Sequence, residues 1–131
     1  MGNSSYQDLR VWQCAIQLAL STYRATEIFP KHETYGLTQQ MRRAAISVAS
    51  NIAEGKGRNT DREFRQFLFN ARGSLLELET QLLIARELSY LPADAYSNLR
   101  KTTKDVGRSL AGLLNSLGLT QFGMLRSEDS L

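Results

Sequence analysis

Histidine and cysteine, the side chains that most often bind metals or act as nucleophiles, each occur once in this 131-residue chain. Cys14 has no neighbouring cation or histidine to activate its thiol, and His32 stands alone in a polar stretch. One of each is too few for a structural zinc site or a Cys–His pair. Glu54, Glu77 and Glu79 have no histidine three residues on, as the ligand sets of di-iron bundles require. The sequence therefore predicts no catalytic residue, no metal site, no cofactor and no enzymatic activity.

Basic residues are the better functional lead. Residues 42–72 carry seven Arg and Lys against three Asp and Glu, a balance of +4. Because the net charge of the whole chain is +3, the remaining residues together have a charge of −1. A second basic group lies at residues 101–108, opposite a predicted apolar face. Such patches neutralise phosphates, although Asp61, Glu63 and Asp105 could instead pair with the cations on a solvated face. The predicted nucleic-acid-binding residues are Arg42, Lys56, Arg58, Arg62, Arg65, Arg72, Lys101, Lys104 and Arg108.

The stretch Gly55-Lys56-Gly57-Arg58 has the composition of a phosphate loop, because glycines let backbone amides approach an anion. A phosphate loop of nucleotide hydrolases follows a strand, whereas this stretch follows a predicted helix. Asp61 and Glu63 also offset the dipole of the helix that begins next. We interpret the stretch first as a helix stop with flanking charge, with a nucleotide site as the alternative.

Apolar residues recur at spacings of three and four in four stretches, which predicts four amphipathic helices. Pro30 and Pro92 fall at the predicted helix boundaries, and Thr60 and Glu63 have the spacing of a capping box. Short connections favour one all-α, antiparallel, up-down-up-down four-helix bundle at residues 6–118, with a disordered segment at 1–5 and a flexible tail at 119–131. The predicted buried faces are Leu9, Trp12, Ile16, Ala19 and Tyr23; Leu37, Met41, Ala45, Val48 and Ile52; Phe64, Leu68, Ala71, Leu75, Leu78, Leu82 and Ala85; and Tyr96, Leu99, Thr103, Val106, Leu110, Leu113 and Leu117.

The two middle helices carry more apolar residues than one core requires. Extra apolar side chains lie away from the predicted buried faces, and on the third helix they are spaced by seven residues. Scattered exposed apolar residues are normal, but this regular spacing favours a subunit interface. The predicted interface residues are Ile46, Ala49, Ala53, Phe69, Leu76 and Leu83.

Several motifs resemble those of a known bacterial family. They are Leu9-Arg10-Val11-Trp12, Phe29-Pro30, Tyr35-Gly36-Leu37-Thr38, Gln40, Arg43-Ala44-Ala45, Ser47-Val48, Asn51-Ile52-Ala53-Glu54-Gly55, Arg58, Glu63-Phe64, Phe67-Leu68, Ala71, Gly73-Ser74-Leu75 and Glu77-Leu78-Glu79-Thr80-Gln81-Leu82. The family is the four-helix-bundle family first noticed as open reading frames inside intervening sequences of large-subunit (23S) ribosomal RNA genes. The resemblance spans residues 6–115, and its most specific part is the run from Asn51 to Gly55.

The resemblance implies a cytosolic bacterial protein that assembles as a ring-like homopentamer. A related branch, the accessory variability determinant of diversity-generating retroelements, binds a reverse transcriptase and nucleic acid through a basic pentamer surface. Within the shared motifs, Arg43, Asn51, Glu54 and Glu77 are expected to form a buried polar network that fixes helix register. Direct contact of these four residues with a ligand is the alternative.

Two functions follow as hypotheses. The first is a non-enzymatic homo-oligomer that binds nucleic acid, structured RNA above all, through its basic patches. The second is an oligomeric protein-interaction scaffold or accessory subunit of another enzyme. A lone cysteine, the lack of a signal-peptide pattern and the lack of a long apolar run predict a cytoplasmic protein that does not enter a membrane.

Overall fold

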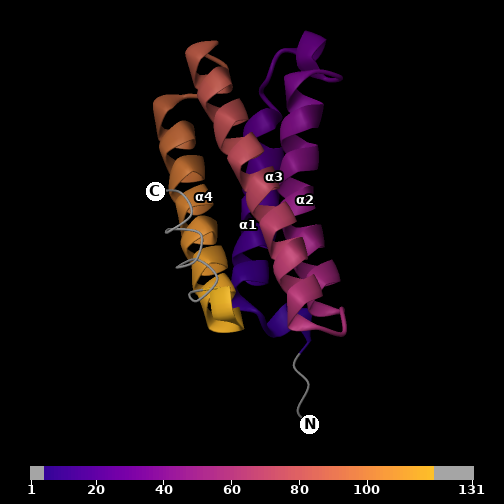
Figure 1. Ribbon diagram of the computed structural model, residues 1–131. Helices are drawn as coiled ribbons and strands as arrows, with labels where there is room; N and C mark the ends of the chain where they lie inside the picture. The colour runs from indigo at the N-terminus through magenta and orange to yellow at the C-terminus, as the bar shows by residue number, and fades with distance from the viewer. Residues whose placement is uncertain (1–4, 120–131) are drawn as a thin grey trace, which may run out of the picture.

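The computed structural model describes residues 5–119 of the chain, in which all four predicted helices are present. Short helical turns precede α1, connect α1 to α2 and follow α4. The helices run alternately up and down, and α4 packs against both α3 and α1 (Figure 1). The predicted all-α, antiparallel four-helix bundle is therefore confirmed. The elements are η1 (Tyr6–Asp8), α1 (Arg10–Thr26), η2 (Lys31–Glu33), α2 (Leu37–Lys56), α3 (Asp61–Glu87), α4 (Ala93–Leu114) and η3 (Asn115–Leu119).

The predicted terminal segments fall almost wholly outside the described residues. Of the segment 1–5, only Ser5 is described, and its hydroxyl accepts a hydrogen bond from the Gln7 amide as the cap of η1. Of the tail 119–131, only Leu119 belongs to a described element.

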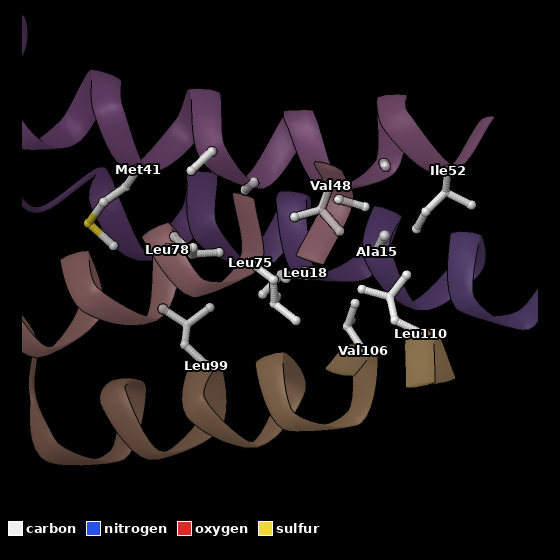
Figure 2. Packing of buried hydrophobic residues seen from close by; sticks show 14 of the residues in the cluster. Ala15, Leu18, Met41, Val48, Ile52, Leu75, Leu78, Leu99, Val106 and Leu110 are labelled. Carbon is white, nitrogen blue, oxygen red and sulfur yellow. The ribbon is translucent and has the colours of Figure 1, made fainter. Parts of the chain in front are cut away.

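One hydrophobic core runs along the bundle axis. Figure 2 shows Leu18 of α1, Val48 of α2, Leu75 of α3 and Val106 of α4 pointing into the same interior. All seven residues of the face predicted for α3 are buried, as are four of the five predicted for α2. Burial of apolar surface, at about 25 cal/mol per Å², is what holds the four helices together.

The face predicted for α1 was wrong by about one residue. Val11, Ala15 and Leu18 are buried, whereas Trp12, Ile16 and Ala19 are half-buried at the edge of the core and Tyr23 is exposed. The true face continues through two threonines, Thr22 and Thr26. Their hydroxyls donate to backbone carbonyls one turn earlier, at 2.8 Å each, so these polar side chains are buried without an unpaired group. Two stripes one residue apart run along α1, and Thr22 and Thr26 make the buried stripe less apolar than its neighbour.

Helices α2 and α3 approach each other closely at Gly55. A Cβ atom there would lie 2.6 Å from Cβ of Phe67 and 3.0 Å from Cδ1 of Phe64, both on α3. Further along the same contact, the hydroxyls of Ser47 and Ser74 form a hydrogen bond of 2.8 Å. Small side chains therefore allow the backbones of α2 and α3 to come close together.

A hydrogen-bonded clasp joins the two loops at the opposite end of the bundle. The carboxylate of Glu33 accepts the backbone N–H of Leu37, where α2 begins, and the hydroxyl of Tyr90, each at 2.9 Å. The Tyr90 ring packs against Phe29, with 5.3 Å between ring centroids. The hydrogen bond from Leu37, followed by that from Tyr90, lowers the pKa of Glu33 below its usual value. The ionised carboxylate thus both caps α2 and fixes the loop between α3 and α4.

We predict that Gly55→Ala destabilises the protein by about 1–3 kcal/mol, because Phe67 must move to admit the new methyl group. Gly73→Ala is the matched control. It lies within α3 with no atom inside 4 Å of the added Cβ, so helix propensity alone should raise stability by up to about 1 kcal/mol. Urea denaturation of the two variants measures both effects, and equal stability of Gly55→Ala and wild type would contradict the close packing.

Candidate nucleic-acid interface

Two of the predicted phosphate-binding arginines hold the bundle together instead. Arg42 donates from Nε to the Thr26 hydroxyl at 2.8 Å and from Nη2 to the Tyr23 carbonyl at 3.2 Å, and its guanidinium stacks on the Tyr23 ring. Arg65 donates to the Leu117 carbonyl at 2.7 Å. Arg42 therefore joins α2 to α1, and Arg65 joins α3 to the end of α4. Part of each guanidinium is therefore engaged within the chain, which leaves fewer of its N–H groups available to a phosphate.

Three other predicted cations lie over aromatic rings. Lys56 lies over Phe64 and Arg72 over Phe69, at 5.9 and 5.7 Å from the ring centroids. Arg58 lies 4.6 Å from the centroid of Phe67 and forms an ion pair of 3.5 Å with Glu54. Lys56 and Arg58 lie near the α2–α3 connection, which we call the α2–α3 corner, whereas Arg72 lies further along α3, and the charge of Arg58 is partly balanced by Glu54. Arg62, close to the start of α3, is exposed and lies beside Glu63 and Gln66.

The most continuous basic surface is the outer face of α4, which we call the α4 cation row: Arg100, Lys101, Lys104 and Arg108. These four side chains surround a shallow hollow with Ser97 and Asp105. Within residues 5–119 the one ion pair of the row joins Arg108 to Asp105, at 3.2 Å. The face therefore presents four cations and one acid to solvent.

Arg100 was not among the predicted binding residues. Its spacing could have identified it, because Arg100, Lys104 and Arg108 follow one another at four-residue intervals and so lie on one helical face. The hollow on α4 includes all three residues. The nine predicted binding residues consequently do not form one surface. Arg42 and Arg65 make contacts within the bundle, Lys56 and Arg58 lie at the α2–α3 corner, and Lys101, Lys104 and Arg108 belong to the α4 cation row.

The predicted interface residues separate in a similar way. Ala49 is only 6% exposed, and although it lines the same surface groove as Ile46 and Ala53, it offers little surface to another subunit. Ile46 and Ala53 line a largely apolar groove between α1 and α2, together with Trp12 and Ile16.

The other three predicted interface residues lie on α3, outside this groove. Leu76 and Leu83 are 53% and 44% exposed, and Phe69 is half-buried. The predicted set thus belongs to two different faces of the bundle.

The predicted polar network does not form as a buried cluster within one chain. Asn51 is half-buried and donates to the carbonyl and hydroxyl of Ser47, at 2.9 and 3.0 Å. Arg43 and Glu77 are exposed on the walls of a surface hollow between α2 and α3, and Glu54 pairs with Arg58 instead. The physical reason is position: these three residues lie on the outer edge of the α2–α3 contact, so water reaches them.

The remaining chemistry-bearing groups do not converge. Gly57 caps the end of α2, its amide donating to carbonyls of the last turn, so the glycine-rich stretch stops a helix. His32 is exposed beside Tyr90, and Cys14 is half-buried. In the part of the chain that the structure describes, no cluster of His, Cys, Asp and Glu is suited to hold a metal ion. No helix within residues 5–119 is both long and apolar enough to span a bilayer.

Comparison with known proteins gives one family and a solved relative. The family model described as "23S rRNA-intervening sequence protein" matches residues 7–112. A crystal structure of a protein with unknown function from the S23 ribosomal protein family of Bacteroides thetaiotaomicron has a similar fold, with a TM-score of 0.72 and 17% sequence identity. The alignment covers 79% of this chain and 97% of that one. No curated protein matches the chain.

We predict that Arg42→Gln lowers the free energy of unfolding by about 1–3 kcal/mol, because it removes charged hydrogen bonds that join α1 and α2. Arg62→Gln, at an exposed position, should change it by less than about 0.5 kcal/mol. Chemical denaturation of the two variants separates these roles. A stable Arg42→Gln protein would return Arg42 to the list of available phosphate-binding residues.

Proposed function

The chain belongs to the family of 23S rRNA-intervening sequence proteins, and from this premise we propose that it is a non-enzymatic protein that binds nucleic acid, structured RNA above all. The observation that carries the proposal is the α4 cation row. Four cations on one helical face, with Asp105 as the one acid among them, can neutralise several phosphates of one strand.

Binding of this kind is driven largely by charge. Arginine and lysine contacts to phosphate position a protein on nucleic acid, but they carry no sequence information. The α4 cation row therefore favours recognition of backbone and shape over base sequence. The exposed Arg62 and the cations at the α2–α3 corner could extend the contact to a folded RNA that wraps around the bundle.

We further propose that the protein is cytoplasmic and self-associates, and the family resemblance suggests a homopentamer. Support for self-association comes from the groove between α1 and α2, where Ile46 is 43% exposed. Closure of this groove by another chain would remove apolar surface from water. An assembly would also repeat the α4 cation row and increase its avidity for a polyanion.

Self-association is tested by light scattering. The protein should show a mass well above the 14.7 kDa of one chain, and Ile46→Glu should lower it because a charge in the groove opposes burial. Ile28→Glu, at a 65% exposed position outside the groove, is the control and should leave the mass unchanged. A wild-type monomer at micromolar concentration would contradict this part of the proposal.

A second candidate function is an oligomeric scaffold or accessory subunit for another enzyme. The observation in its favour is that apolar side chains are exposed on α3 as well as in the groove between α1 and α2. One surface could then contact further copies while the other binds a partner protein. Capture of one defined partner that persists after nuclease treatment would support this function over RNA binding.

The RNA-binding proposal is tested by reversing charge on α4. In fluorescence anisotropy with a labelled structured RNA, Lys101→Glu/Lys104→Glu should weaken binding at least roughly tenfold and flatten its dependence on salt, because about two phosphate contacts are lost. Arg10→Glu/Lys31→Glu makes the same change in net charge at exposed positions outside the α4 cation row, and should have a much smaller effect. Equal losses in both variants would show that only net charge matters.

A further inference from the structure

We propose that the strand held by the α4 cation row is unpaired, and that its bases rest on an exposed apolar ridge of α3. The ridge consists of Phe69, Leu76 and Leu83. This inference rests on the proposed function and narrows its ligand to single-stranded RNA, such as a loop or bulge of a structured RNA. The juxtaposition of the ridge and the cation row is its physical basis.

Three consecutive residues of α3 locate the ridge. The Ser74 hydroxyl bonds to Ser47, so this position faces α2. Leu75 is buried, and its side chain lies 3.6 Å from the Cβ position of Gly107 on α4. Each residue turns a helix by about 100°, so Leu76 lies beyond Leu75 on the outer surface next to α4. Leu83 and Phe69 share this face because they are seven residues to either side of Leu76.

The same reasoning places the cations of α4 beside that ridge. Val106 is buried, Gly107 faces Leu75 of α3, and Arg108 lies one further step round the helix, on the outside. Lys104 and Arg100, four and eight residues before Arg108, lie between the directions of Gly107 and Arg108. The helices α3 and α4 are neighbours that lie closest near the loop joining them and diverge toward the other end of the bundle (Figure 1). The cation row and the apolar ridge therefore run along neighbouring edges of one face.

The dimensions of this face suit one extended strand. Arg100, Lys104 and Arg108 of the row follow one another at four-residue intervals, or about 6 Å along the helix, close to the separation of phosphates in an extended strand. Arg72 lies over the ring of Phe69 and adds a cation between ridge and row. A strand with its phosphates along α4 would direct its bases over α3. Proteins that bind single strands combine a basic track with aromatic side chains on which the bases stack. Here Phe69 is the aromatic residue of the ridge, and Leu76 and Leu83 extend it with apolar surface.

An unpaired strand fits the ridge better than a duplex does. Leu76 and Leu83 are 53% and 44% exposed, and a duplex presents mainly sugars and phosphates that gain little from contact with leucine. The face of an unstacked base is apolar, and its removal from water onto a leucine or phenylalanine is favourable. Unpaired loops are also the parts of structured RNA in which bases are accessible to protein.

A second copy of the chain is a poorer occupant of this face. If two copies paired through the same face, their cation rows would come together and repel one another. If the face instead met the apolar groove between α1 and α2, few acids would be available. Helix α1 contains no Asp or Glu, and the only acid of α2 is Glu54, which pairs with Arg58. The counter-charges for the cation row are therefore best supplied by a polyanion.

Fluorescence anisotropy compares binding of three probes: a single-stranded RNA, an abasic strand of the same length, and a perfectly paired RNA duplex. The single strand has roughly 12 nucleotides, within the usual range of site sizes for proteins that bind single strands. Leu76→Ser/Leu83→Ser should weaken binding of the single-stranded RNA about tenfold while affinity for the abasic strand and the duplex changes less than about twofold. The salt dependence should stay unchanged, because no phosphate contact is removed. Leu20→Ser/Leu88→Ser, at two exposed leucines off the ridge, is the matched control and should bind all three probes like wild type.

A gain-of-function variant guards against effects on folding. Leu76→Tyr keeps the position apolar and adds an aromatic face, so it should strengthen binding of the single-stranded RNA several-fold without strengthening binding of the duplex.

The possible failures are distinguishable. If wild type binds none of the three probes, the proposed function itself fails. If it binds RNA but the ridge variants affect all probes equally or none, the ridge does not contact bases and this inference is overturned while the proposed function stands. If Leu76→Ser/Leu83→Ser lowers the mass measured by light scattering, the ridge is a contact between copies, and the inference is likewise overturned.

Discussion

Close packing of α2 against α3 determines which side chains α3 presents to the core and which to solvent. Gly55 lets the backbone of α2 come close to Phe64 and Phe67, and the Ser47–Ser74 hydrogen bond fixes the register further along. Because Ser74 faces α2, Leu75 must face the core and Leu76 the outer surface beside α4. A rotation of α3 by one residue would bury a leucine of the ridge and expose one of the core. The surface assigned to the ligand is therefore set by an interior contact on the other side of the same helix.

Much of the fold could be predicted from the sequence because apolar and polar residues recur with the period of an α-helix, which separates a buried face from an exposed one. Every apolar position predicted for α3 is buried, and Thr60 caps α3 by accepting the Glu63 amide at 3.1 Å. The face of α1 could not be predicted from hydrophobicity, because Thr22 becomes a core residue only by bonding to a carbonyl of its own helix. Such a bond leaves no mark on the apolar pattern.

The candidate site was harder to predict than the fold. Sequence gives the number of cations in a segment but not their partners, and Arg42 and Arg65 turn out to donate to groups 16 and 52 residues away. Arg100 was missed because the charge count drew attention to residues 42–72, although its spacing with Lys104 was visible. The small exposed fraction of Ala49 could not be predicted either, because a helical wheel shows only angles, whereas burial depends on how closely α1 packs against α2.

The clasp at one end of the bundle gives the molecule unequal ends. Glu33 and Tyr90 tie the loop between α1 and α2 to the loop between α3 and α4, so the two helix pairs cannot separate there without breaking the clasp. At the opposite end the last turn is held mainly by Arg65, and the backbone leaves the helix at Gly118 with φ of +91°. Amide protons in the last turn of α4 should exchange with solvent before those beside the clasp, as fraying starts where the fewest groups must part. Helix α4 is thus held at its start and loosens from its end, while α2 and α3 stay packed together at Gly55.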